Sequence, residues 1–256
     1  MKKSLLKLIS ALLSVLFWVL VWAAISFKVN NAFLLPGPID TLSTLFELFA
    51  DADFWTTAAI SLARILAGVL AAITIGSAVA VFTAKISAAG ALLSPMMTLI
   101  KATPIASFIV LALLWIDRNS LPVFITVLIV LPVVWSNVSS GIKAVDGGLL
   151  EVAKVYRFSL GKRIMRVYLP SVTPYFLAAC RASFGMAWKA GIAAEVLCTP
   201  KHAIGTQIYF SKTYFETSDL FAWTLTIIIL SVIIEKLLIF SLERLANRLH
   251  VRRSEV

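Results

Sequence analysis

The segment LPVFITVLIVLPVVWSNVSSGI, residues 121–142, decides the fold because it contains 22 consecutive residues without a charge. An α-helix needs about 20 predominantly apolar residues to cross the hydrocarbon core of a bilayer. Two other uncharged segments of comparable length, residues 8–27 and 65–84, precede it in the chain. Together these three segments predict a helical membrane protein.

The amino-acid composition supports the same prediction. Of the 256 residues, 60% are hydrophobic and 14% are charged, whereas soluble domains are about 45–50% apolar and about 25% charged. This composition excludes a soluble enzyme, and three further apolar segments with isolated charges raise the expected number of spans to six. We expect an all-α polytopic membrane protein that forms one domain over residues 1–256, with spans at about 8–27, 58–84, 92–116, 121–142, 171–197 and 220–240.

The positive charges indicate the orientation of these spans. With the N-terminus in the cytoplasm, 15 of the 23 lysines and arginines lie inside, 4 lie outside and 4 lie within the spans. This asymmetry follows the positive-inside rule and predicts that both termini are cytoplasmic. The net charge of +10 is then explained without a nucleic-acid partner. The 15 inner cations are Lys2, Lys3, Lys7, Lys85, Lys143, Lys154, Arg157, Lys162, Arg163, Arg166, Lys236, Arg244, Arg248, Arg252 and Arg253.

Aromatic residues agree with this topology. Trp22, Trp55, Trp115 and Trp223 all fall at the expected outer interface, where indole rings are enriched. The longest external loop joins the first two spans, and it contains an apolar pattern with helical spacing. We therefore expect an amphipathic helix over Asp40–Ala50, either as a passive connector or in contact with an external partner. Its apolar positions are Leu42, Leu45, Phe46 and Phe49.

The second span carries a small residue at every fourth position, namely Gly68, Ala72, Gly76 and Ala80. Such a stripe allows helix backbones to approach closely. We expect it to serve helix packing within this chain, with a contact between subunits as the alternative.

The sequence contains no recognisable catalytic or metal-binding cluster. Cys180 and Cys198 are expected to lie about 27 Å apart on one helix, and His202 and His250 fall on opposite sides of the membrane. The phosphate-binding pattern G-x-x-x-x-G-K-[ST] is also absent, since the nearest fragment, Gly161-Lys162, lacks the first glycine. We expect neither a bound metal nor ATP on this chain, and a membrane-embedded enzyme is disfavoured.

The cytoplasmic segment 143–170, between the fourth and fifth spans, has too much helical character for a linker. We expect a short helix over Leu149–Tyr156 and a second short helix that begins after an N-cap at Ser159. In the second helix, Leu160, Ile164 and Val167 share one face, while Lys162, Arg163 and Arg166 face away. Two short helices with exposed charge fit docking onto another protein, and a solvated loop at the lipid headgroups is the alternative.

This segment resembles the EAA loop of binding-protein-dependent ABC importer permeases. Glu151-Val152-Ala153 and Val167-Tyr168-Leu169-Pro170 have the spacing of the pattern Glu-Ala-Ala, three residues, Gly, nine residues, Ile-x-Leu-Pro. Two departures are evident. Val152 replaces the first alanine, and Arg157 stands where the family has a turn glycine, with Gly161 too late to replace it.

Other segments resemble the nitrate/sulfonate/taurine branch of the same family, so the resemblance covers nearly the whole chain. These segments are Leu34–Pro38, Ser61–Arg64 with Gly68, Pro104 with Leu114-Trp115, and Ala194–Val196 with Ile204-Gly205. The resemblance implies an importer in the cytoplasmic (inner) membrane with a second permease copy in a homodimer. It also implies two cytoplasmic ATPase subunits that bind ATP and Mg, and an external solute-binding protein. The residues it implies for ATPase coupling are Glu151, Val152, Ala153, Arg157, Gly161, Leu169 and Pro170.

Ionisable side chains within the spans are candidates for the translocation path, because a charge at bilayer depth is costly and usually functional. Arg181 and Lys189 are separated by eight residues, or about 80° around a helix, so they can line one side. Arg64 and Lys101 lie close enough to the span boundaries to snorkel, and Glu195 is expected to pair with a cation on a neighbouring helix. The excess of three positive charges among these five residues favours an anionic solute such as a sulfonate, taurine or nitrate.

Two other functions stay open from the sequence. One is a permease for a thiamine-precursor or riboflavin-type solute. The other is a stand-alone six-helix channel or carrier, which would need broken helices at the midplane or paired repeats. Pro104 and Pro132 are positioned to break helices, but residues 1–128 and 129–256 show no convincing repeat.

Overall fold

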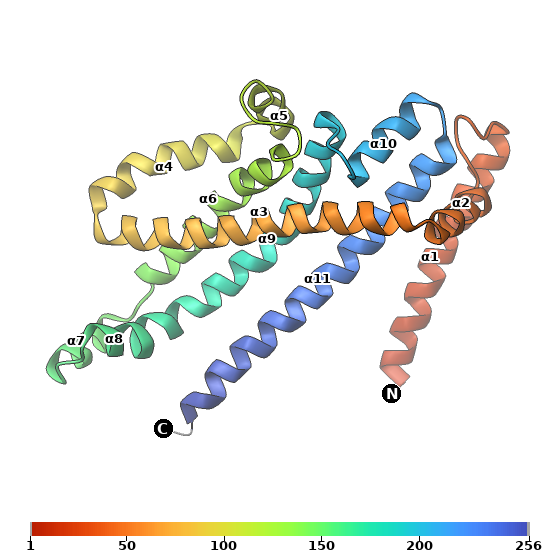
Figure 1. Cartoon of the computed structure of the whole chain (residues 1–256). Coiled ribbons are helices and arrows are strands. Elements are labelled where there is room, and N and C mark those ends of the chain that lie inside the picture. The colour runs from red at the N-terminus through yellow and green to blue at the C-terminus, as the bar shows by residue number, and fades with distance from the viewer. Residues whose placement is uncertain (1, 255–256) are drawn as a thin grey trace.

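The structure is a computed structural model that describes residues 2–254, and the side chains of residues 9, 10, 12–241 and 244. All elements in this described part are helical (Figure 1). They are α1 (Lys2–Val29), α2 (Pro38–Ala50), α3 (Ala52–Lys85), α4 (Ser87–Ala102), α5 (Ile105–Ala112), α6 (Leu121–Lys143), α7 (Gly147–Val155), α8 (Leu160–Arg163), the π-helix η1 (Ile164–Tyr168), α9 (Leu169–Cys198), α10 (Ile204–Thr213) and α11 (Thr217–Ser254).

Five of the six expected spans lie on single helices, and the third does not. Residues 92–116 were expected to form one span, but α4 and α5 meet there at a bend of 102°. Pro104 has no N–H to continue the helix, and it favours an extended backbone at the preceding residue. Thr103 accordingly has φ −80° and ψ 134°. α5 then ends at Ala112 rather than at residue 116.

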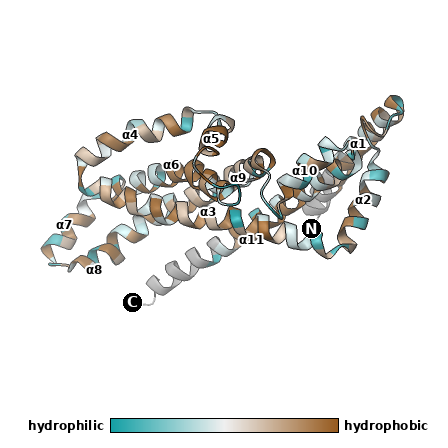
Figure 2. Ribbon diagram, turned by 45° about the horizontal axis from the view of Figure 1, so that its top comes forward, coloured by the Kyte–Doolittle hydropathy of each residue, from teal (hydrophilic) through white to brown (hydrophobic). Residues whose placement is uncertain are grey.

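Several helices have the length and apolarity of membrane spans. Within the described residues, four single helices meet this criterion: α1, α3, α6 and α11. The bent pair α4–α5 is a fifth if it counts as one span. α9 has 30 residues, but it carries Arg181, Lys189 and Glu195 among its apolar side chains. The chain is therefore a multi-pass membrane protein, and Figure 2 shows apolar residues along most of α3, α4 and α6.

The core is formed by α3, α6 and α9, which pack along much of their length. The small-residue stripe of α3 is buried, and it faces α6 of the same chain. A Cβ atom on Gly68 would lie 2.7 Å from the Thr126 Cβ, and one on Gly76 would lie 3.0 Å from the Val134 Cβ. The absence of a side chain at these two positions thus lets the two helices approach closely.

The remaining helices surround this core. α7 and α8 lie at the opposite end of the molecule from α2 and α10 (Figure 1). The expected amphipathic helix is present as α2, with Leu45 buried and Phe46 68% exposed. Trp223, one of the tryptophans expected at the outer interface, is buried within the protein and stacks on Phe54 at a centroid distance of 4.9 Å.

Some charged and titratable residues considered in the sequence lie outside the described side chains. They are Lys2, Lys3, Lys7, Arg248, His250, Arg252 and Arg253.

Candidate functional site

One face of α9 is exposed and carries both of its cations. Arg181 and Lys189 lie on this face together with small residues, so the helix presents a shallow strip of mixed charge and small side chains. The small residues are Ala178, Ala182, Gly185 and Ala193, of which Gly185 is partly exposed and the others exposed. A Cβ atom added to Gly185 would meet no heavy atom within 4 Å. The opposite face, including Trp188 and Ala194, is buried against the core.

The other two candidate cations have different surroundings. Lys101, at the end of α4, places its Nζ 3.4 Å from the Ser136 Oγ of α6. Arg64, on α3, donates to the backbone carbonyls of Lys201 at 2.6 Å and His202 at 3.1 Å. These contacts tie Arg64 to the loop after α9.

Arg64 also forms an ion pair with Glu195, whose side chain is fully buried. The Arg64 Nη1 lies 3.6 Å from the Glu195 Oε1. This contact confirms that Glu195 pairs with a cation on a neighbouring helix. It also means that the positive excess among the charges of the spans resides in Lys101, Arg181 and Lys189, since Arg64 and Glu195 compensate each other.

Glu195 joins three helices through its second carboxylate oxygen. Its Oε2 accepts hydrogen bonds from the Ser61 hydroxyl at 2.9 Å and from the Gly205 N–H at 3.2 Å. The Ser61 Oγ in turn accepts from the Ile204 N–H at 2.8 Å. A Cβ atom on Gly205 would lie 2.5 Å from the Glu195 Cβ, so only glycine fits here. We call Ser61, Arg64, Glu195, Ile204 and Gly205 the Glu195 clamp.

The sequence placed these clamp residues in separate family-like segments but did not connect them. Ser61 was noted only as part of Ser61–Arg64, and Gly205 only as a neighbour of Ile204. The signal that was available is a carboxylate inside an apolar helix, because a buried charge requires a partner. The identity of that partner depends on how α3 and α10 pack against α9, which the sequence alone does not give.

At the other end of the molecule, α7 carries the Glu151-Val152-Ala153 motif. Its N-terminus is capped by Asp146, whose side chain accepts from the Gly148 N–H at 2.8 Å. Glu151 and Val152 are exposed, whereas Ala153 is buried. The motif therefore anchors α7 by its alanine and presents its carboxylate outward.

The turn after α7 forms without glycine. Arg157 adopts a left-handed conformation with φ 49°. The Phe158 N–H donates to the Ala153 carbonyl at 2.8 Å, and the Arg157 N–H donates to the Lys154 carbonyl at 3.0 Å. This pair of bonds is the Schellman motif, in which glycine is the usual left-handed residue. Arg157 thus occupies the glycine position of the family pattern and adopts the glycine conformation.

The second short helix differs from its expected form. Ser159 caps it as expected, accepting from the Lys162 N–H at 3.5 Å, but α8 continues without a break through η1 into α9. The three apolar side chains expected to share one face differ in exposure: Leu160 is 77% exposed and Ile164 is 55% exposed, whereas Val167 is buried. Arg163, expected to face away, is partly buried. The wide π-turn changes the angular spacing of the side chains, so the simple helical pattern fails here.

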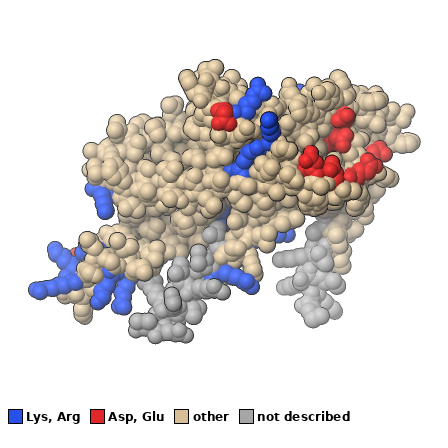
Figure 3. Space-filling model, viewed as in Figure 1, with Lys and Arg blue, Asp and Glu red and all other residues tan. Residues whose placement is uncertain are grey.

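An apolar and cationic surface therefore covers the end of the molecule formed by α7, α8 and η1. Its large exposed apolar side chains are Leu149, Val152, Val155, Tyr156, Leu160, Ile164 and Met165. Figure 3 shows lysine and arginine side chains gathered at the same end, and acidic side chains gathered at the opposite end. We call this the coupling surface.

The structure brings the family-like motif residues to this surface only in part. Leu169 is exposed and Pro170 partly exposed at the start of α9, and Gly161 lies in open space on α8. Together with α7, these residues follow one another along a continuous path from Glu151 to Pro170. The arrangement presents exposed side chains of short helices at this end of the molecule.

Curated proteins similar to this chain are transport permeases. The chain is 28% identical to the putative aliphatic sulfonates transport permease protein of Bacillus subtilis, over 79% of this chain and 74% of that protein. It is 28% identical to a bicarbonate transport system permease protein of Synechococcus elongatus, over 82% of this chain and 79% of that protein. It is also 26% identical to the taurine transport system permease protein of Escherichia coli, over 84% and 80% respectively.

A solved structure and a family model also match transport proteins. The fold resembles a chain from a crystal structure of an amino acid ABC transporter with histidines, with a TM-score of 0.55, 16% identity, and coverage of 82% of this chain and 96% of that chain. Residues 65–251 match the family described as binding-protein-dependent transport system inner membrane component. The match covers well over half of the chain, and the protein belongs to this family of ABC transporter permease subunits, in its nitrate/sulfonate/taurine branch.

Proposed function

We propose that this permease imports a small oxyanion and that the exposed face of α9 lines the translocation path. The observation that carries the proposal is the position of Arg181 and Lys189 on that face, about 12 Å apart along the helix axis. Relatives of the chain are named for sulfonates, bicarbonate, taurine and nitrate, all of which carry an anionic group. A path with two cations favours such solutes by charge complementarity.

The complete transporter in this proposal contains two copies of the chain. Small residues beside Arg181 and Lys189 allow a second helix to approach closely, so the same strip of α9 serves as the contact between copies. Each copy has six spans, formed by α1, α3, α4–α5, α6, α9 and α11, and forms one transmembrane domain over residues 1–256. Both termini face the cytoplasm, and the protein resides in the cytoplasmic (inner) membrane.

The coupling surface at α7, α8 and η1 receives one of two cytoplasmic ATPase subunits, which bind ATP and Mg. Its exposed Leu160 and Tyr156 supply apolar contact area, and Glu151 supplies a charge at its edge. The chain itself carries no phosphate-binding loop and performs no catalysis. On the opposite side, an external solute-binding protein delivers the solute near α2, whose Ile39 and Phe46 are exposed.

The test is uptake into proteoliposomes that contain the permease, its ATPase and the solute-binding protein. Radiolabelled taurine, nitrate and bicarbonate serve as solutes, with Arg181→Gln, Lys189→Gln and the double variant compared with the wild-type protein. We expect each single variant to reduce anion uptake by about tenfold, which corresponds to the loss of one charge-assisted contact of about 1.4 kcal/mol.

The matched control is Lys212→Gln, which removes an exposed cation from α10 outside the strip. Uptake by this variant should equal that of the wild-type protein. If the Arg181→Gln, Lys189→Gln double variant takes up anions as fast as the wild-type protein, the exposed face of α9 does not line the solute path.

A further inference from the structure

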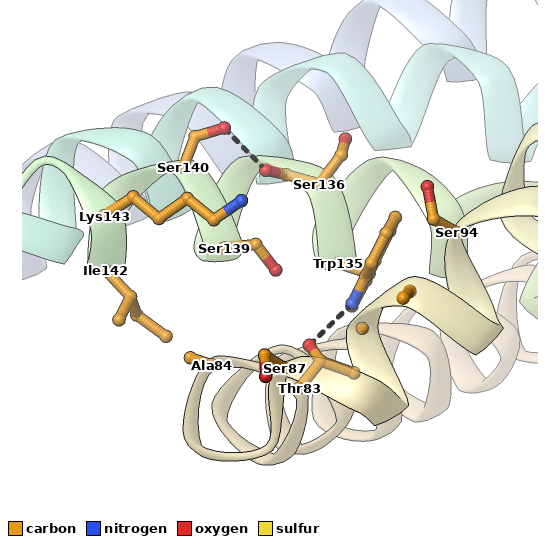
Figure 4. A pocket seen from close by; sticks show the side chains of 12 residues that line it. Thr83, Ala84, Ser87, Ser94, Trp135, Ser136, Ser139, Ser140, Ile142 and Lys143 are labelled. Atoms are coloured by element: carbon orange, nitrogen blue, oxygen red, sulfur yellow. Dashed lines mark hydrogen bonds between the residues drawn. The ribbon is translucent and has the colours of Figure 1, made fainter.

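A cavity of about 710 Å³ lies between the end of α3, the first half of α4 and the end of α6. Hydroxyl groups from all three helices line it (Figure 4). They belong to Thr83, Ser87, Ser94, Ser136, Ser139 and Ser140. The transport function described above does not use these residues. Thr83, Ser136 and Ser140 already donate to backbone carbonyls of their own helices. The hydroxyls of Ser87, Ser94 and Ser139 are left to donate to a polar ligand.

The charge in and around this cavity is positive. Lys143 is the one charged residue among those that line it, and it is exposed at the end of α6. In Figure 4 its side chain runs along α6 toward Ser136. The Lys101 Nζ approaches the same Ser136 Oγ to 3.4 Å. One ammonium group thus lines the cavity and a second contacts one of its lining residues, which favours an anion over a cation or a neutral ligand.

The N-terminus of α4 adds partial positive charge. This 16-residue helix begins at Ser87, and its N-cap residue Ile86 provides no side-chain hydrogen bond. The first backbone N–H groups of a helix have no partner within the helix, and they bind anions readily. Ser87 and Gly90, both in the first turn of α4, line the cavity. The Gly90 N–H donates to the Ile86 carbonyl at 3.2 Å, so of the two only Ser87 offers its N–H to a ligand.

One wall hydroxyl has no partner. The Ser139 Oγ is buried and forms no hydrogen bond in the structure, and Figure 4 shows it pointing from α6 into the cavity. A buried hydroxyl without a partner is unfavourable, because it has lost its hydrogen bonds to water. By contrast, the Trp135 Nε1 donates to the Thr83 Oγ1 at 3.0 Å, which holds α6 against α3 across the wall.

From these features we infer that the cavity binds a phosphate group. Tetrahedral phosphate oxygens accept hydrogen bonds from hydroxyls, from helix N-terminal N–H groups and from lysine, and the cavity presents all three. Such a group can belong to an anionic phospholipid or to free inorganic phosphate. The cavity lies where α3 and α6 end in Lys85 and Lys143, and Ala84, Ala91 and Ile142 add apolar wall, which suits a headgroup with the start of its acyl chains.

Native mass spectrometry of the purified full chain in detergent tests this inference. Dioleoylphosphatidylglycerol and the zwitterionic dioleoylphosphatidylcholine are titrated against the wild-type protein and the Lys143→Gln and Ser139→Ala variants. We expect the wild-type protein to retain phosphatidylglycerol preferentially. Lys143→Gln should weaken this retention by about tenfold, the usual size of one lost charge-assisted hydrogen bond, and Ser139→Ala should weaken it less.

Lys154→Gln is the matched control, because it removes the same charge from exposed α7 outside the cavity and should retain the lipid as the wild-type protein does. Added inorganic phosphate separates the two sources. If millimolar phosphate displaces phosphatidylglycerol, the cavity also takes free phosphate, and if it does not, the occupant is the lipid headgroup. Equal retention of the two lipids by the wild-type protein, or equal behaviour of Lys143→Gln and Lys154→Gln, would overturn the inference.

Discussion

The two ends of the helix that runs from α8 through η1 to α9 differ in how far the chain itself completes their contacts. At the α9 end, Glu195 is fully buried and contacts α3 and α10 through Ser61, Arg64 and Gly205. At the α8 end, Leu160 and Ile164 are exposed and lie beside cationic side chains. The difference teaches that contacts within the chain are concentrated at the α9 end, while the α8 end leaves apolar and cationic side chains uncovered.

The strongest way to break this comparison is to remove Glu195. Glu195→Ala deletes the acceptor for the Ser61 hydroxyl and the Gly205 N–H, and it leaves Arg64 without its carboxylate. Loss of one partner from a buried ion pair costs about 3–5 kcal/mol. We expect about 3 kcal/mol, because Arg64 keeps its carbonyl contacts to Lys201 and His202. The measurement is chemical unfolding in detergent.

Glu151→Ala is the matched control for that experiment, since it removes an exposed carboxylate from α7. Its free energy of unfolding should lie within about 0.5 kcal/mol of the wild-type value. Similar destabilisation by the two variants would contradict the division between the two ends.

A charge reversal on α7, beside the exposed α8, sharpens the same comparison. Glu151→Arg should leave the permease inserted and folded, yet reduce ATPase co-purification and solute uptake by at least about tenfold, or about 1.4 kcal/mol of binding free energy. The physical reason is that a cation replaces the one carboxylate of a surface that is otherwise cationic. Pull-down of the ATPase and uptake into proteoliposomes measure the two effects. Undiminished association and uptake would remove Glu151 from the proposed contact.

The smallest expected effect concerns the turn at Arg157. A non-glycine residue in the left-handed region is destabilised by about 1–2 kcal/mol. Replacing it with glycine removes this strain, but part of the gain is offset because glycine loses more conformational entropy on folding. Arg157→Gly should therefore stabilise the end of α7 by up to about 1 kcal/mol. Hydrogen exchange should show slower exchange of the Phe158 N–H, which donates to the Ala153 carbonyl.

Gly161→Ala provides the comparison for the turn, because a Cβ atom there would meet nothing within 4 Å. This variant should leave exchange at Phe158 unchanged. Faster exchange at Phe158 in Arg157→Gly would show that the arginine side chain, and not the turn geometry, holds the end of α7.

The sequence predicts the helices of this protein better than their breaks. The uncharged segment 121–142 falls within α6, because its length and apolarity leave few other structures in a bilayer. Pro104 marks a possible break, but the bend of 102° at that point depends on how α5 packs against α6 and α9. A local rule therefore locates the break without giving its angle.

The candidate site also has some features that the sequence predicts and others that depend on how the helices pack. The exposure of Arg181 and Lys189 on one side of α9 follows from helical spacing, and the need of Glu195 for a cation follows from its apolar surroundings. The choice of Arg64 as that cation requires the packing of α3 on α9. The face that Leu160, Ile164 and Val167 were expected to share contains two exposed residues and one buried residue, and the π-turn at η1 that interrupts it has no signal in the apolar pattern.

The helical path from Leu160 to Cys198 contains 39 residues, a length of about 58 Å at 1.5 Å per residue. If an ATPase binds α7 and α8 as proposed, this rod would act as a lever whose far tip is held by the contacts of Glu195. A push on its α8 end would then turn the rod about that tip and move its middle, where Arg181 and Lys189 lie, sideways. The five-residue wide turn of η1 interrupts the regular α-helical hydrogen bonding of the rod, so it would lie between the proposed ATPase contact and the proposed solute path.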